Sequence, residues 1–268
     1  MYEGEIKKLG DKVYIRTIGD VTVSDYHKND TITYENIESP DIELTIDYAK
    51  KWAFKIDNID RYQSDIKLMD KWAEDATYRM KKAIEETVLP TLDGSAHASN
   101  KGTTAGHVCA AYNLGESTSP VDISRSNIIN YICYAGGVLD EENVPETDRF
   151  LLIPSIAAVL LKTSDIKDAS LTGDNVSTLR NGRLGRVDRF TIYTSNLLEK
   201  TLEGSAYAYN MIFGHPMALT FASQYTETKF IPQPETTFGQ LMAGLNVFGF
   251  KVIKEEALGC LYGRPVLT

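Results

Sequence analysis

The chain has 268 residues, of which 43% are apolar, so it can bury a sizeable core as one large domain or two smaller ones. Its formal net charge of -9, with the Lys and Arg residues scattered, argues against a protein whose main task is to grip nucleic acid. No apolar run is long enough to span a bilayer and the N-terminus shows no signal peptide, so we expect a protein made in a cytosol.

Short runs of alternating apolar and polar residues, which predict strands, begin the chain. Their apolar members are Val13, Ile15, Ile18, Val21, Val23, Ile42, Leu44, Ile46, Trp52, Phe54 and Ile56. Residues 25–40, between the first two runs, are polar and slightly acidic. We therefore predict an extended ribbon of two or three strands. Because such a ribbon is marginally stable by itself in water, something outside the chain's own core should cover it.

Residues 59–92 form one long segment whose apolar residues recur at alternating steps of three and four, which predicts a helix with one buried face. Asp60 is a candidate N-cap, and Pro90 with Gly94 closes the segment. At the usual helical rise the helix would be about 50 Å long. A coiled coil is the alternative, but only about four heptads fit and the seam is rich in Ala, Tyr and Thr, so a packed scaffold helix is favoured.

Residues 93–119 are dense in Gly, Ser, Ala and Thr and include the run 102–106 (GTTAG). A phosphate-binding loop is disfavoured here, because there is no Gly-Lys-Ser/Thr ending and no strand directly before it. A second helix is predicted from Asp122 or Ser124, and Gly136-Gly137 is expected to stop it.

The second half of the chain predicts mostly strands. In order, we expect a buried strand ended by Pro154, a helix, a polar loop and a strand (149–153, 155–162, 163–180, 186–194). Two later apolar segments, 207–225 and 241–253, suit the strands of a half-buried sheet. Gly244 and Gly249 in the second of these mark a bulge or a close approach of backbones.

Residues with catalytic or metal-binding chemistry are present but form no recognisable motif. The four histidines are far apart, and none lies at a metal-ligand spacing (His27, His97, His107, His215). His97 and His107 share the glycine-rich loop, where a site could be built, but solvated or hydrogen-bonded loop histidines are the favoured interpretation. Ser195-Asn196 follows a predicted strand without the Gly-x-Ser-x-Gly pattern of a nucleophile elbow.

Neighbouring carboxylates could act as acid and base, but pairs so close in sequence are usually surface charge (Asp57 and Asp60; Asp140, Glu141 and Glu142). Three cysteines without close spacing predict buried thiols in a reducing compartment and no disulfide frame (Cys109, Cys133, Cys260). We therefore expect a protein that is not an enzyme, with no catalytic, cofactor-binding or metal-ligating residues.

Eight segments resemble parts of one known protein family, both in their residue pattern and in their order along the chain. They are residues 10–16 (GDKVYIR), 23–26 (VSDY), 44–47 (LTID), 54–63 (FKIDNIDRYQ), 149–154 (RFLLIP), 179–196 (LRNGRLGRVDRFTIYTSN), 214–218 (GHPMA) and 244–253 (GLNVFGFKVI). The first four resemble the extended-loop and spine-helix entry of tailed-bacteriophage major capsid proteins, the next two the middle of such proteins, and the last two their final sheet. Each segment alone is a weak motif, whereas the whole set in the correct order is hard to obtain by chance.

The resemblance implies an α+β fold of the Hong Kong ninety-seven type. Its parts would be an N-terminal segment with an extended β-hairpin loop, a peripheral domain with the spine helix, an inserted axial domain and peripheral return strands (1–58, 59–118, 119–221, 222–268). The family usually has an N-terminal arm or a cleaved scaffolding segment before the loop, and this sequence starts almost at the loop. Either the arm is absent, or the numbering begins at the first ordered or mature residue.

The function that the resemblance implies is structural: a subunit that self-assembles into the icosahedral head shell around a double-stranded DNA genome. Expected partners are copies of itself in pentamers and hexamers, portal and scaffolding proteins, optionally a decoration protein, and packaged DNA in weak non-specific contact, with no membrane. The expected location is the virion, assembled in the host bacterial cytoplasm. The alternatives are an encapsulin-like nanocompartment shell and a hydrolase or nucleotide-binding enzyme, which would need a convergent polar cluster.

Overall fold

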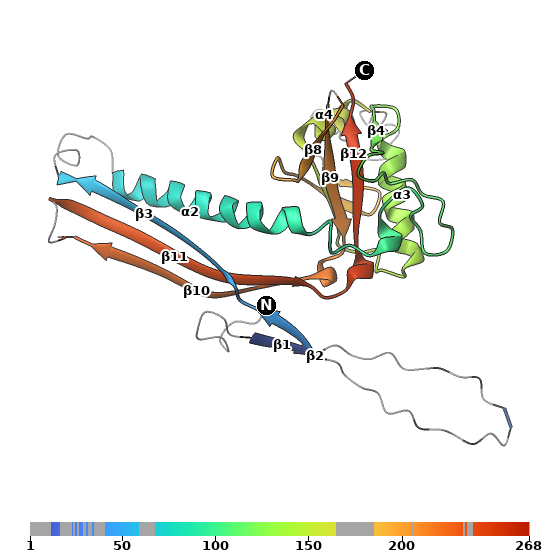
Figure 1. Ribbon diagram of the computed structural model, residues 1–268, viewed down its shortest axis with the longest axis horizontal. Helices are drawn as coiled ribbons and strands as arrows, with labels where there is room; N and C mark the ends of the chain where they lie inside the picture. Colours follow the sequence, from blue (N-terminus) through green and yellow to red (C-terminus); the bar gives the residue numbers. More distant parts are fainter. Residues whose placement is uncertain are drawn as a thin grey trace. The chain divides into compact units, whose positions relative to one another are not determined.

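The computed structural model describes residues 12–16, 23, 25, 27–28, 31, 34, 41–58, 68–164, 185–204, 206–232, 234 and 238–267. The chain divides into two compact units, Met1–Met69 with Phe221–Lys251 and Asp70–Thr220 with Val252–Thr268. Each unit therefore combines segments that are far apart in the sequence. Helices and strands are mixed along the chain, as the predicted α+β class requires (Figure 1).

The first unit is built from strands (Figure 1). β1 (Lys12–Arg16) and β2 (Asp41–Thr45) pair antiparallel. β10 (Leu219–Ile231), β11 (Gly239–Val252) and β3 (Tyr48–Asp57) form a second sheet with β11 in the centre. These pairings confirm the strands predicted near residues 13, 44 and 54. Most of the predicted polar segment 25–40 lies outside the described residues.

Glycines in β11 let neighbouring groups approach closely. A Cβ at Gly244 would lie 2.4 Å from the Trp52 indole, and one at Gly249 would lie 2.3 Å from the Thr45 carbonyl oxygen. Close approach is therefore confirmed at both positions. The ring of Tyr48 also stacks on that of Phe248, with centroids 5.5 Å apart.

Helix α2 (Leu68–Val88) is the described part of the predicted long helix. Its more sheltered residues follow the helical spacing and include Ala73, Ala76, Met80 and Ala83. The 3-10 turn η1 (Leu89–Thr91), with Pro90 near its start, follows the helix. The predicted N-cap, Asp60, lies outside the described residues.

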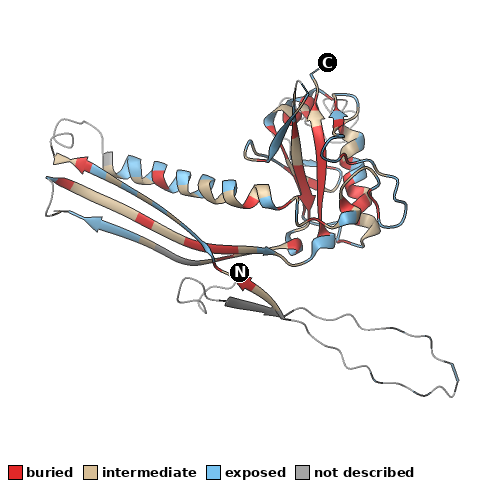
Figure 2. Ribbon diagram, viewed as in Figure 1, coloured by how far each residue is buried: buried red, intermediate tan, exposed pale blue. Residues whose placement is uncertain are grey.

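A larger sheet forms the centre of the second unit. Its strands, in spatial order, are β4 (Val121–Ile123), β12 (Leu258–Pro265), β9 (Ala206–Gly214), β5 (Arg149–Ile153), β7 (Phe190–Thr194) and β6 (Arg186–Val187), with β8 (Lys200–Glu203) also paired to β9. β4 and β12 are parallel, as are β5 and β7. Burial is concentrated in β9 and β12 (Figure 2). β12 thus shares a sheet with strands from residues 119–221.

Helices α3 (Ile128–Glu141) and α4 (Ser155–Thr163) belong to the same unit, with the short turns η2 (Ala98–Asn100), η4 (Pro216–Ala218) and η5 (Glu255–Ala257). α4 confirms the helix predicted after Pro154. The prediction that Gly136-Gly137 stops the preceding helix was wrong, because α3 runs through both residues. A Cβ at Gly137 would lie 2.8 Å from the Tyr112 hydroxyl, so this glycine makes room for a neighbouring side chain.

The predicted strand 186–194 is in fact a tight hairpin of β6 and β7, which pair antiparallel. Asp188 in the turn has a φ of 53°, a left-handed conformation that Asp tolerates better than most residues. The apolar alternation changes phase across this turn, from Val187 to Phe190 and Ile192, and the prediction of a single strand missed that change. Of the predicted polar loop 163–180, residues 165–180 lie outside the described residues.

Candidate functional site

The glycine-rich loop brings His97 and His107 to one carboxylate just after α3. The Nδ1 atoms of His97 and His107 lie 3.7 Å and 3.6 Å from Glu142 Oε1. The Glu142 side chain is 9% exposed, and within the described part of the chain its Oε1 has no hydrogen-bond partner. His97 Nδ1 also accepts a hydrogen bond from the Ser99 N–H and so caps η2. Sequence spacing did not predict that these three side chains meet.

Glu141 fixes the same loop to the end of α3. Its Oε2 accepts hydrogen bonds from the N–H groups of Val108, at 2.7 Å, and Cys109, at 3.1 Å. A hydrogen bond from the Cys109 thiol and the bond from Val108 hold the pKa of Glu141 below its ordinary value, because they favour the charged carboxylate. The loop is therefore attached to α3 by a charged acceptor.

Imidazole and carboxylate groups are zinc ligands in many proteins. Among the residues that the structure describes, however, no group of three or more His, Cys, Asp or Glu side chains could hold a metal ion. The observed contacts of this cluster attach the loop to α3.

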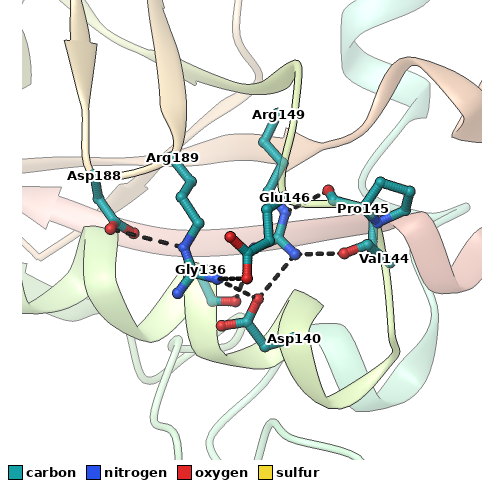
Figure 3. Close-up of polar contacts among 8 residues, drawn as sticks. All are labelled: Gly136, Asp140, Val144, Pro145, Glu146, Arg149, Asp188 and Arg189. Atoms are coloured by element: carbon teal, nitrogen blue, oxygen red, sulfur yellow. Dashed lines mark hydrogen bonds and ion pairs between the residues drawn. The ribbon is translucent and has the colours of Figure 1, made fainter.

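The remaining carboxylate of the predicted acidic group, Asp140, takes part in a separate cluster around Arg149 (Figure 3). The Arg149 side chain is fully buried, and its guanidinium lies 2.9 Å from Asp140 Oδ1. It also donates to three main-chain carbonyls, one inside α3 and two just beyond its end (Gly136, Val144, Pro145). Arg189, from the β6–β7 turn, donates to the same Asp140 oxygen at 2.7 Å. This cluster ties α3 to β5 and to the hairpin.

A cavity of about 550 Å³ lies in the second unit between the glycine-rich loop and strands β8, β9 and β12. The Nδ2 atom of Asn210 lies 2.9 Å from Asp93 Oδ2 and 3.3 Å from Glu199 Oε2. Residues 102–104 line the cavity, and its charged lining residues are Asp93, Glu116, Glu199 and Lys101. Three carboxylates against one ammonium oppose the binding of a phosphate, which agrees with the sequence argument against a phosphate loop.

The other candidate residues are scattered. The Ser195 hydroxyl accepts a hydrogen bond from the Leu197 N–H, and Asn196 accepts one from the Ser155 N–H. His215 caps η4, His27 is exposed, and Asp57 lies 3.8 Å from Lys55. Asp60 is not among the described residues. None of the contacts found at these residues joins a nucleophile to a base.

The prediction of buried thiols is correct for Cys260 alone. Burial raises the pKa of this thiol. Cys109 and Cys133 are exposed, so the prediction was wrong for both.

Apolar side chains are exposed on several strands. In the β8–β9 pair, Leu202 lies opposite Tyr207, and the two residues are 60% and 48% exposed. On β7, Tyr193 is 54% exposed. No described helix is both long and apolar enough to cross a membrane. Apolar side chains exposed singly are normal on protein surfaces, so these residues alone do not define an interface.

Comparison with known proteins identifies the fold. No family model and no curated protein matches the sequence. Solved structures do match over nearly the whole length, and the fold is that of phage capsid chains.

Three of these structures illustrate the similarity. A chain of Mycobacterium phage Che8 is 22% identical, with a TM-score of 0.69, covering 94% of this chain and 84% of its own. A chain from the capsid structure of the cyanophage P-SCSP1u is 15% identical, with a TM-score of 0.70 and coverage of 98% and 86%. A chain from the asymmetric unit of the bacteriophage PhiM1 mature capsid is 13% identical, with a TM-score of 0.58 and coverage of 100% and 91%.

Proposed function

We propose that this chain is a structural subunit that self-assembles into the icosahedral head shell enclosing the double-stranded DNA genome of a tailed bacteriophage. The observation that carries the proposal is the fold, because the similarity spans nearly all of this chain and most of each phage chain. The order of the sequence segments that resemble such capsid proteins supports it independently.

The proposed location is the virion, and the principal partners are copies of the same chain in pentamers and hexamers. Portal and scaffolding proteins, and optionally a decoration protein, are the further proposed partners. Packaged DNA would make only weak contact, since the chain carries a net charge of -9 and would repel a polyanion. The residue ranges given above for the extended loop and the peripheral and axial domains remain part of this proposal.

The N-terminal ribbon is the element proposed to reach a neighbouring subunit. β1 and β2 pair only with one another in the described sheets. The base of this ribbon is covered by its own chain, since Leu44 and Ile46 are fully buried. The proposal that residues 20–50 pack on the peripheral domain of an adjacent copy therefore concerns the part beyond that base, because a two-stranded ribbon is marginal alone. Shells that still close from a chain lacking residues 20–40 would contradict this placement.

Electron microscopy and sedimentation of the purified chain test the function. The expected result is closed shells of uniform diameter, or capsomer-sized oligomers that close when a scaffolding partner is supplied. A monomer at every concentration and salt tested, with or without that partner, would disprove the proposal. Particles purified from infected or induced cells should contain double-stranded DNA, whereas a protein cargo without DNA would favour the nanocompartment.

A further inference from the structure

Strand β10 leaves one edge of its sheet open. It pairs with β11 on one side, and on its other side there is no strand among the described residues. Such an edge presents main-chain N–H and C=O groups that can pair with another strand. The end of β10 is exposed (Figure 2), with Phe230 at 51% and Ile231 at 44%. A partner strand at this edge would also cover apolar side chains.

The charges near this end are self-complementary. Glu227 and Lys229 lie on either side of Thr228, on one face of the strand, and their charged groups are 3.6 Å apart. If two copies of β10 pair antiparallel about a two-fold axis at Thr228, Glu227 of each copy lies opposite Lys229 of the other. A charged side chain on an edge strand, lysine above all, normally opposes pairing with another strand. Here each lysine would face a carboxylate, and two opposite-charge pairs would form.

The opposite edge of the same sheet differs. β3 carries Lys50, Lys51 and Lys55, with Asp57 as its one carboxylate. Two copies of this edge would bring an excess of positive charge together. The charge pattern thus favours β10 over β3 as an edge that meets its own copy.

An apolar groove next to β10 adds to the argument. It has a volume of about 360 Å³ and reaches from β3 across β11 to Lys229 and Ile231 of β10. Its lining is mostly apolar, with Ala53, Leu241 and Ala243 among the residues. Pairing at the β10 edge would continue this face across the two-fold axis into the second copy.

We propose that β10 pairs edge to edge with β10 of a second copy, antiparallel about a two-fold axis at Thr228, so that two sheets join into one. This inference rests on the proposed shell function, because it names one of the contacts by which copies of the chain would associate. A two-fold contact of this kind uses the same patch on both subunits.

Charge reversal tests the pairing. Glu227→Lys alone and Lys229→Glu alone should each raise the critical concentration for particle formation about tenfold, because both cross-strand pairs become like-charged. An equimolar mixture of the two variants should restore assembly, since a chain with two lysines at this edge would then face a chain with two glutamates. The double variant Glu227→Lys/Lys229→Glu should also assemble normally, which controls for folding. A mixture as defective as its components would overturn the proposal.

A disulfide provides a second measurement. Cys109 and Cys133 are first replaced by Ser, because both are exposed. Thr228→Cys in that background should give a covalent dimer on oxidation, since paired Cα atoms in an antiparallel ladder lie about 4.5–5.5 Å apart, within the range for a disulfide. Lys51→Cys on β3 is the control and should give none. Particles that form without the Thr228→Cys dimer would disprove this contact alone, whereas an unmodified chain that never associates would disprove the shell function as well.

Discussion

At the scale of single residues, Arg149 shows how a charged group can begin a buried strand. Its guanidinium is fully buried, yet it reaches three main-chain carbonyls and the Asp140 carboxylate. Burying an arginine is tolerable only when its donors are matched in this way. The sequence shows an arginine before four apolar residues, but nothing in the pattern reveals its partners.

Replacing Arg149 by Met should lower the free energy of unfolding by about 3 kcal/mol, because buried carbonyls and one carboxylate lose their donor. Urea unfolding of the unassembled subunit measures this effect. Arg189→Met is the matched control, since Arg189 shares Asp140 but is 30% exposed and should cost at most about 1 kcal/mol. Equal losses for the two variants would contradict the role assigned to Arg149.

Gly137 gives a prediction whose sign opposes the usual rule. Gly→Ala inside a helix ordinarily stabilises by about 1 kcal/mol. Here Gly137→Ala should destabilise α3, because the new Cβ would lie 2.8 Å from the Tyr112 hydroxyl. In a Tyr112→Phe background the cost should shrink, since the closest atom is gone. Thermal unfolding of the unmodified chain, the two single variants and the double variant completes a double-mutant cycle. Additive changes in stability would refute the proposed contact.

Three consecutive carboxylates show why the clusters could not be predicted from sequence. Asp140, Glu141 and Glu142 are adjacent, yet they contact an arginine pair, two loop N–H groups and two histidines, respectively. Successive residues at a helix end point in directions about 100° apart. Which group each one meets depends on loops folded from distant sequence. The interpretation of such runs as general surface charge therefore missed specific contacts at all three residues.

At the scale of elements, the attachment of the glycine-rich loop to α3 should depend on pH through Glu141. Because the pKa of Glu141 is lowered in the folded chain, its contribution to stability is present above its ordinary value near 4.5 and is lost as the pH falls through the folded value. Glu141→Gln should therefore be less stable than the unmodified chain at neutral pH, and the difference should shrink below about pH 4.

The measurement is urea unfolding of the unmodified chain and of Glu141→Gln, from neutral pH to below about pH 4. Glu116→Gln is the control, because Glu116 is an exposed loop residue. Its stability should stay parallel to that of the unmodified chain at every pH. If Glu141→Gln lost as much stability in acid as at neutral pH, the charge of Glu141 would not be what holds the loop.

The elements themselves were largely predictable, because periodicity is a local property. α2 was found from its spacing of three and four, and β5 from five residues ended by proline. The errors fall where a distant partner decides the local structure. The two glycines lie inside a helix where side chains from elsewhere take the space beside them, Asp188 at Gly136 and Tyr112 at Gly137. The hairpin near Asp188 is held to the body of the unit by the contact of Arg189 with Asp140.

At the scale of the whole molecule, the sequence predicted the fold through the order of its segments more than through any one of them. β12 pairs with β4, whose residues lie more than 130 positions earlier in the sequence, and with β9, whose residues lie about 50 positions earlier. Periodicity carries no information on such partners, whereas similarity to a known family does. The two-unit division likewise depends on long-range contacts that a local pattern cannot supply.

The net charge of the chain makes a prediction about assembly. Each subunit carries -9, so copies repel one another before their surfaces meet. The range of that repulsion falls from about 10 Å at about 0.1 M salt to about 3 Å at about 1 M. The critical concentration for particle formation should therefore fall as NaCl is raised over this range, which light scattering can follow. If assembly instead weakened steadily with added salt, attraction between opposite-charge pairs such as those proposed at β10 would outweigh the net repulsion. The Glu227→Lys/Lys229→Glu chain keeps these pairs, so it should then show the same salt dependence as the unmodified chain.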